Sequence, residues 1–199
     1  MPAPRYHHGN LRRALLDEAI RTIQTYGVER LTMRTLGGRL GVSRSALYRH
    51  FADKQALLAA VGCEGFSMLR QAIADAWEQN GRGVIGFQAM GKAYVQFAVA
   101  HPSHYRVMFG GFIESSAQDE RFIAEAKAAF QALVDALVDQ RNTGMIRGDD
   151  PVLTARYVWA LVHGISMLVI DGQLREKGQG EELEQYALER LCASIAAPS

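Results

Sequence analysis

Paired helix-start and helix-stop signals between residues 31 and 51 constrain the fold more than any other feature of the sequence. The segment reads LTMRTLGGRLGVSRSALYRHF. Thr32 is suited to cap a short helix, and Gly41 supplies the positive φ at which such a helix ends. Ser43 is suited to cap a second short helix that reaches about Phe51. Two short helices joined by a tight glycine turn predict helix-turn-helix geometry.

The second of these helices has an apolar side and a side rich in hydrogen-bond donors. Val42, Leu47 and Phe51 are spaced to point inward. Gly37 is expected to leave room where the two helices cross closely. The donor-rich side chains are then free to face outward, where a DNA major groove would offer them phosphates and base edges. These side chains are Arg44, Ser45, Tyr48 and Arg49.

Charge is distributed unevenly along the chain. Residues 1–60 carry ten Lys or Arg and four acidic residues, a net charge of +6, whereas residues 61–199 carry twelve and seventeen, a net charge of −5. A basic segment joined to an acidic body favours an anionic partner for the basic end, and nucleic acid is the usual one. A merely solvated basic face is equally compatible with the charge alone.

Helical signals continue through the rest of the chain, and no segment has a convincing strand pattern. Asn10 is expected to cap a helix that ends at Gly27, and Asp53 to cap a long helix over about 54–79. We therefore expect an all-α chain of about nine helices, with a helix-turn-helix domain over 1–60 and a second helical domain over 61–199. The later segments are a helix up to residue 100, a short element over 103–112, and helices over about 118–142, 151–173 and 182–196.

The stretch LTMRTLGGRLGVSRSALYRHFADKQALL, residues 31–58, resembles the DNA-binding domain of the tetracycline-repressor (TetR) family of bacterial regulators. The shared pattern is a threonine-capped helix, GVS, an LY pair, HF, and a lysine that opens the next helix. Gly37 and Gly38 stand where alanine is more usual, and Gln55 where glutamate is common. Farther on, HPSHYRVMF (101–109) and WALVHG (159–164) resemble a subgroup whose ligand domain carries a Trp and a His-Gly.

The resemblance implies DNA-binding roles for particular residues of the helix-turn-helix and of the start of the next helix. Residues that match base-facing positions are Arg34, Arg44, Ser45 and Ala46. Arginine suits this task because its guanidinium can bind guanine O6 and N7 with two hydrogen bonds. Residues that match phosphate-contacting positions are Thr32, Tyr48, His50 and Lys54, and the Ser43 cap completes the predicted DNA-binding set.

The acidic body is richer in aromatic and methionine side chains than a plain helical core requires. Such side chains can line an adaptable pocket for a small apolar or amphipathic effector, and each of them is also a normal core residue. The resemblance adds that the body binds an effector and joins two chains through its last two long helices. The candidate effector-binding residues are Phe87, Met90, Tyr94, Phe97, Met108, Phe109, Phe112, Phe130, Trp159, His163 and Met167.

Two short motifs suggest an enzyme but lack the required context. GRGVIG (81–86) matches a dinucleotide-binding pattern yet follows a helix instead of a strand, and GFQAMGKA (86–93) has Ala93 where a phosphate-binding loop needs a hydroxyl. His101 and His104 lack a convincing third metal ligand. No nucleophile, base and orienting group occur together. We therefore predict no enzymatic activity, no metal and no cofactor.

Two classes of function remain from sequence. The favoured class is a sequence-specific DNA-binding regulator, most simply a ligand-responsive repressor that binds a palindromic operator as a homodimer. The alternative is a helical small-molecule-binding protein or enzyme without a DNA-binding role. The basic N-terminus lacks a signal peptide pattern and no run approaches a membrane span, so we expect a cytoplasmic protein without membrane contact.

Overall fold

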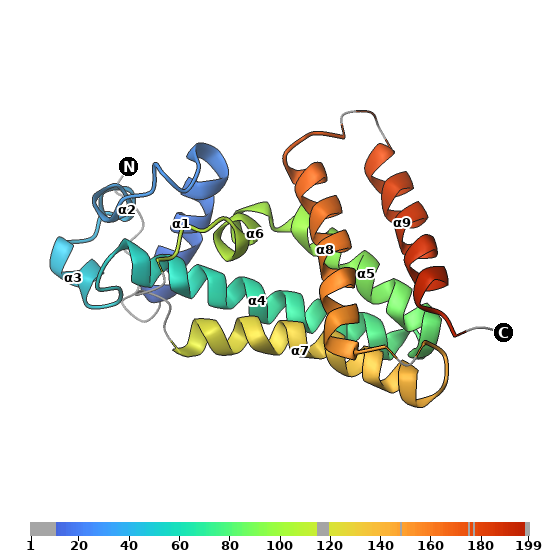
Figure 1. Cartoon of the computed structure of the whole chain (residues 1–199). Helices are drawn as coiled ribbons and strands as arrows, with labels where there is room; N and C mark the ends of the chain where they lie inside the picture. The colour runs from blue at the N-terminus through green and yellow to red at the C-terminus, as the bar shows by residue number, and fades with distance from the viewer. Residues whose placement is uncertain (1–10, 115–119, 148, 175, 177, 198–199) are drawn as a thin grey trace. The chain divides into compact units, whose positions relative to one another are not determined.

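The computed structural model describes residues 11–114, 120–147, 149–174, 176 and 178–197, and every regular element in them is an α-helix (Figure 1). The expected all-α class is therefore confirmed. The helices of this part of the chain are α1 (Leu11–Tyr26), α2 (Met33–Leu40), α3 (Arg44–Tyr48), α4 (Lys54–Gln79), α5 (Gly83–Ala100), α6 (Pro102–Phe109), α7 (Glu120–Asn142), α8 (Pro151–Ile170) and α9 (Gln179–Ile195).

Several helix ends differ from the predicted ones. The second short helix, α3, ends at Tyr48 and not near Phe51, because the N–H groups of His50 and Phe51 both bond to the carbonyl of Leu47 and close a tight turn. The predicted cap Asn10 and the predicted helix start at Gln118 lie outside the described residues.

Glycines set the boundaries of the last two helices. α8 stops at Ile170 and not at residue 173, because Gly172 adopts a φ of +67° and its N–H bonds back to the carbonyl of Val169. α9 begins three residues earlier than predicted, because the carbonyl of Gly178 (φ +91°) already accepts the bond from the N–H of Glu182.

The chain forms two compact units. The first contains residues up to Gly65 together with Ser103–Ile123, and the second contains Phe66–Pro102 and Ala124–Ser199. Helix α4 contributes to both, since its first half belongs to the first unit and its second half to the other. The predicted domain division at residue 60 stays a prediction.

The first unit has a leucine-rich core beneath the short helices. Leu15 of α1, Leu36 of α2, Leu47 of α3 and Leu57 of α4 are each exposed by 1% or less. α2 and α3 are too short to be stable alone, so this shared core holds them in place. The start of α4 is also fixed by Gln55, whose amide donates to the carbonyl of Phe112 and accepts from the N–H of Glu114.

In the second unit, α5 packs against both α8 and α9, and α8 packs against α9 (Figure 1). The contact with α9 is close at Gly91, where a side chain would overlap Leu188. Helix α8 is apolar over most of its length: an 18-residue window has a mean hydropathy of 1.5, yet only 28% of that window is buried. By length and composition alone it is the single described helix that could cross a membrane, which is weak grounds for a membrane span.

Candidate DNA-binding interface

Side-chain caps define where the two short helices of the predicted helix-turn-helix, α2 and α3, begin. The hydroxyl of Thr32 accepts a hydrogen bond from the N–H of Thr35 at 3.1 Å, and the Thr35 hydroxyl accepts one from the N–H of Thr32 at 3.3 Å, which completes a capping box at α2. At α3, the Ser43 hydroxyl accepts from the N–H of Ala46 at 3.2 Å. Both caps lie where the sequence predicted them.

The turn between α2 and α3 depends more on Gly41 than on Gly37. Gly41 adopts a φ of +64° and a ψ of 27°, the left-handed conformation expected for it. Gly37 lies where the two helices come close together, as expected, since a Cβ there would lie 3.4 Å from Leu47 Cδ1 and 3.5 Å from the Val42 carbonyl. These are ordinary contacts, so an alanine would fit.

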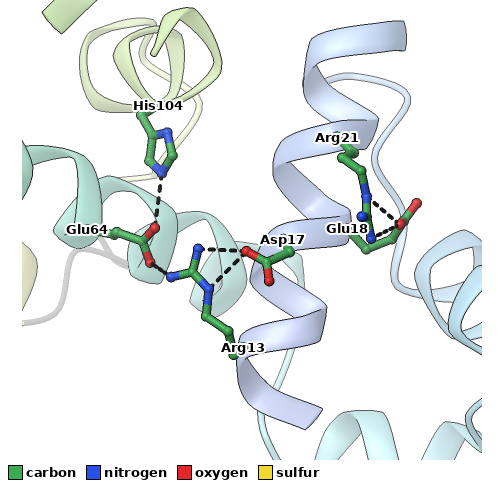
Figure 2. A network of polar contacts seen from close by, with 6 residues as sticks. All are labelled: Arg13, Asp17, Glu18, Arg21, Glu64 and His104. Carbon is green, nitrogen blue, oxygen red and sulfur yellow. Dashed lines mark hydrogen bonds and ion pairs between the residues drawn. The ribbon is translucent and has the colours of Figure 1, made fainter. Parts of the chain in front are cut away.

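Some arginines of the first unit form ion pairs that hold its helices together, and others form none. The paired arginines make up the first group. Arg13 forms ion pairs with Asp17 at 2.6 Å and Glu64 at 2.7 Å, and Glu64 also faces His104 of α6 (Figure 2). The carboxylate of Glu18, itself 8% exposed, binds Arg21 at 2.7 Å (Figure 2).

Arg39 completes this first group. Its guanidinium binds Glu18 and the Thr22 hydroxyl, both at 3.1 Å, and lies over the ring of Tyr26. The hydrogen bond that Arg39 donates to the Glu18 carboxylate raises the pKa of Arg39. Arg39 therefore fastens α2 to α1 and has little charge to offer a partner.

The second group of arginines lies on α2, on α3 and directly after α3. Arg34, Arg44 and Arg49 are exposed and form no ion pair within the described part of the chain. The Arg44 guanidinium lies 5.3 Å from the ring centroid of Tyr48, one turn along α3, so the ring supports it from one side. Arg12 and Arg30 are also exposed and have no ion pair among the described residues, and Arg34, Arg44 and Arg49 are the unpaired arginines that lie on or next to the predicted helix-turn-helix.

The remaining predicted DNA-binding residues lie around these arginines. Ser45 and His50 are exposed, Ala46 is half-buried, and Tyr48 is 40% exposed. Lys54, predicted to contact phosphate, is half-buried, and its ammonium group donates to the carbonyl of Val28 at 2.9 Å. This bond ties the start of α4 to the loop after α1, a role that sequence reasoning missed because the two residues are far apart in the chain.

Comparison with known proteins agrees with this arrangement. Residues 15–61 match the model for bacterial regulatory proteins of the tetR family, and residues 87–191 match the model for the tetracyclin repressor-like C-terminal domain. The chain belongs to the TetR family. TetR proteins are transcriptional regulators and not enzymes, so the sequence-based expectation of a DNA-binding regulator is confirmed at the family level.

Individual relatives of this TetR protein are distant but cover nearly the whole chain. The HTH-type transcriptional repressor Rv1474c of Mycobacterium tuberculosis is 28% identical over 91% of this chain and 89% of its own length. The repressor AcnR of Corynebacterium diphtheriae is 23% identical over 90% and 86%. A Rhodococcus sp. RHA1 protein of unknown function has the same fold, with a TM-score of 0.86, 32% identity, and coverage of 98% and 100%.

The predicted effector-binding residues are divided between the two units. Met108, Phe109 and Phe112 belong to the first unit. The others belong to the second, where those of α5 are buried and those of α7 and α8 are half-buried or exposed; they are Phe87, Met90, Tyr94, Phe97, Phe130, Trp159, His163 and Met167.

Four of these side chains form one aromatic cluster. The Trp159 indole N–H donates to the Tyr94 hydroxyl at 3.1 Å, and its ring meets Phe130 edge-on at a centroid distance of 6.1 Å. His163, one turn along α8, lies 6.0 Å from the same ring, and burial lowers the pKa of its imidazole. Trp159 remains 38% exposed, so the cluster has an accessible aromatic face.

The second unit also contains a groove that the sequence did not predict. A groove of about 760 Å³ runs between α5 and α9, and none of the predicted effector-binding residues lines it. Its walls combine apolar residues such as Ile85 and Leu188 with acidic ones, of which Glu184 has a pKa raised by burial. The sequence did not predict this groove, because polar and apolar residues alternate on α5 and α9 in the same way as on an ordinary helix surface.

The enzyme-like motifs and the histidine pair have structural explanations. Gly83 begins α5, so GFQAMGKA lies inside a helix and GRGVIG spans the turn between α4 and α5. His101 stacks on Phe97, while His104 faces Glu64. The described residues contain no group of three possible metal ligands.

Proposed function

We propose that this protein represses transcription by binding a palindromic operator as a homodimer, and that a small effector releases it. The observation that supports this most directly is the separation of the arginines. Those that fasten α1, α2 and α4 together are neutralised by carboxylates, whereas Arg34, Arg44 and Arg49 keep their charge beside exposed hydroxyl groups. A duplex would supply the phosphates that this cluster of unpaired arginines lacks within the chain.

The proposed contacts follow from how each side chain is held. Arg34 and Arg44, with Ser45 and the small Ala46, would read base edges in the major groove. Stacking on Tyr48 holds the Arg44 guanidinium in a limited range of positions, which favours a bidentate bond to guanine. The residues proposed to fix the register on the DNA backbone are Thr32, Ser43, Tyr48, His50 and Lys54.

The proposed dimer would cover the exposed apolar face of α8 and α9. Leu153 is 64% exposed, Tyr157 53% and Leu168 41%, and these positions recur at the spacing of one helical face. Tyr186 of α9 is 58% exposed. Two copies joined here would carry two reading heads, which suits half-sites about 34–36 Å apart. A repressor of this kind would act in the cytoplasm, where it meets the chromosome.

The effector is proposed to act through the second unit. The aromatic cluster around Trp159 would bind an apolar or amphipathic molecule. Helix α4 runs without interruption from Lys54 to Gln79, so it joins that unit covalently to the reading helices. The effector releases DNA only if it binds more tightly to the conformation that fits the operator poorly.

Selection of bound fragments from the source genome, followed by gel-shift titration, tests the proposal. We expect a recovered palindrome and a steep fall in affinity with rising salt. Arg44→Ala should weaken binding and relax preference at one position of each half-site, worth about 1–3 kcal/mol. Arg141→Ala is the matched control, because Arg141 is an equally exposed arginine without an ion pair, on α7. Failure to retain any fragment at low salt would refute the proposal.

A further inference from the structure

A recess of about 480 Å³ lies between α2 and α3. Its apolar lining comes from Met33, Val42 and Leu47, and both Met33 and Leu47 are buried in the core beneath it. Gly37 and Gly38 line it with backbone alone. A Cβ on Gly38 would meet no atom within 4 Å, so this lining position has open space in which a side chain could be placed.

The backbone of the recess has little to offer a polar ligand. The carbonyl of Gly37 already accepts a hydrogen bond from the N–H of Val42 at 3.0 Å, and the carbonyl of Gly38 accepts one from Gly41 at 3.4 Å. A polar group that entered would lose water without gaining these acceptors. The lining therefore selects for an apolar group.

The rim has the opposite character. Arg34, Arg44 and Tyr48 surround the opening, all three are exposed, and the two guanidinium groups have no ion-pair partner in the described chain. A molecule that matches both parts must present an apolar group while being strongly anionic around it.

Duplex DNA meets this requirement at one base. In the major groove the C5 methyl of thymine is the apolar group on the base edges, and phosphates and guanine acceptors lie nearby for the arginines. We propose that the recess receives a thymine methyl group, so that Gly38 determines a preference for thymine at one position of each half-site. This inference rests on the proposed function and adds a specificity determinant to it.

The test replaces each operator thymine in turn by deoxyuridine, which pairs identically but lacks the methyl group. With the wild-type protein, substitution at one position should weaken binding about fourfold per half-site, the value for losing the burial of one methyl-sized group (about 0.8 kcal/mol). Gly38→Leu places a bulky side chain at the recess and should abolish the difference between thymine and uracil at that position. Gln24→Leu, an exposed position on α1, is the matched control and should keep it.

Equal affinity of the wild-type protein for every uracil-substituted operator would overturn the inference, as would an unchanged penalty in Gly38→Leu. Either result would leave the proposed function standing, because the unsubstituted operator is still bound. Absence of binding to any operator would instead refute the proposed function. If the leucine variant no longer binds DNA, Gly38→Ala decides the outcome, because its side chain occupies less of the recess. Gly38→Ala should reduce the preference for thymine over uracil. An undiminished preference in this variant would contradict the inference.

Discussion

Two glycines three residues apart allow a prediction in which the same added methyl group has opposite effects on stability. Gly38 lies inside α2 with a negative φ, whereas Gly41 ends that helix with a φ of +64°. A Cβ at either position would meet no atom within 4 Å. Steric overlap is therefore absent in both cases, and the backbone conformation alone separates Gly38→Ala from Gly41→Ala.

The magnitudes follow from this comparison. Alanine restricts the unfolded chain in both variants, which favours folding by about 0.8 kcal/mol in a helix interior. Gly38→Ala should thus be more stable than the wild type by about this amount. Gly41→Ala has the same gain but must place a Cβ in the left-handed region, at a cost of about 1–2 kcal/mol. The unfolded-state contribution is common to both variants, so their free energies of unfolding should differ by about 1–2 kcal/mol.

Urea denaturation followed by far-ultraviolet circular dichroism measures this difference, at one fixed protein concentration because association also stabilises the fold. Gly41→Asn is the control, since asparagine tolerates the left-handed region better than alanine and should recover part of the loss. Equal urea midpoints for Gly38→Ala and Gly41→Ala would refute the assigned conformation of the turn. A lower midpoint for Gly38→Ala than for Gly41→Ala would refute it as well.

Three further predictions concern the DNA-binding face, the dimer and pH. Lys54→Met should lower the salt dependence of DNA binding by about one charge, and should also lower the free energy of unfolding by about 1 kcal/mol because the Val28 carbonyl loses its donor. Salt titrations and urea denaturation separate the two effects, and unchanged stability would contradict the structural role. Leu153→Glu should shift the protein from dimer to monomer in analytical ultracentrifugation, and a persistent dimer would exclude this face. Burial lowers the pKa of His163, so the folded state binds fewer protons than the unfolded one and stability should fall as the pH drops below about 6.5. His163→Gln should flatten urea midpoints between pH 7.5 and 5, and an equally steep fall would assign the effect to other groups.

The features that could be predicted from sequence are local in the chain. The capping roles of Thr32 and Ser43 and the turn at Gly41 depend on bonds that span three to five residues, so the residue types at those positions were sufficient. The end of α3 at Tyr48 was not predicted, because Arg49 and His50 are compatible with a further helical turn, whereas in the structure the N–H groups of His50 and Phe51 both bond to the Leu47 carbonyl.

Long-range partners could not be predicted in the same way. Arg39 and Arg44 are both exposed arginines in helical segments, and nothing in their neighbours along the chain predicts that Arg39 has a carboxylate partner. Only the fold brings Glu18, twenty-one residues away, against Arg39. The same holds for Lys54, whose type and position fitted a phosphate contact while its ammonium group is bound to Val28.

The apolar composition of helix α8 favours an interface with a second chain, because much of its apolar surface is not buried within one chain. A helix that is apolar on all sides normally lies in a core, yet α5 and α9 cover only one side of this one. Leu153 and Tyr157 are 64% and 53% exposed, so leaving them in water forgoes roughly 1–2 kcal/mol of burial for each. A second copy that presents the same face would recover this free energy for both chains at once, because each residue of a two-fold interface is counted twice. The apolar excess of α8 thus supports the dimer independently of the DNA-binding face, which needs the same two-fold symmetry to read two half-sites.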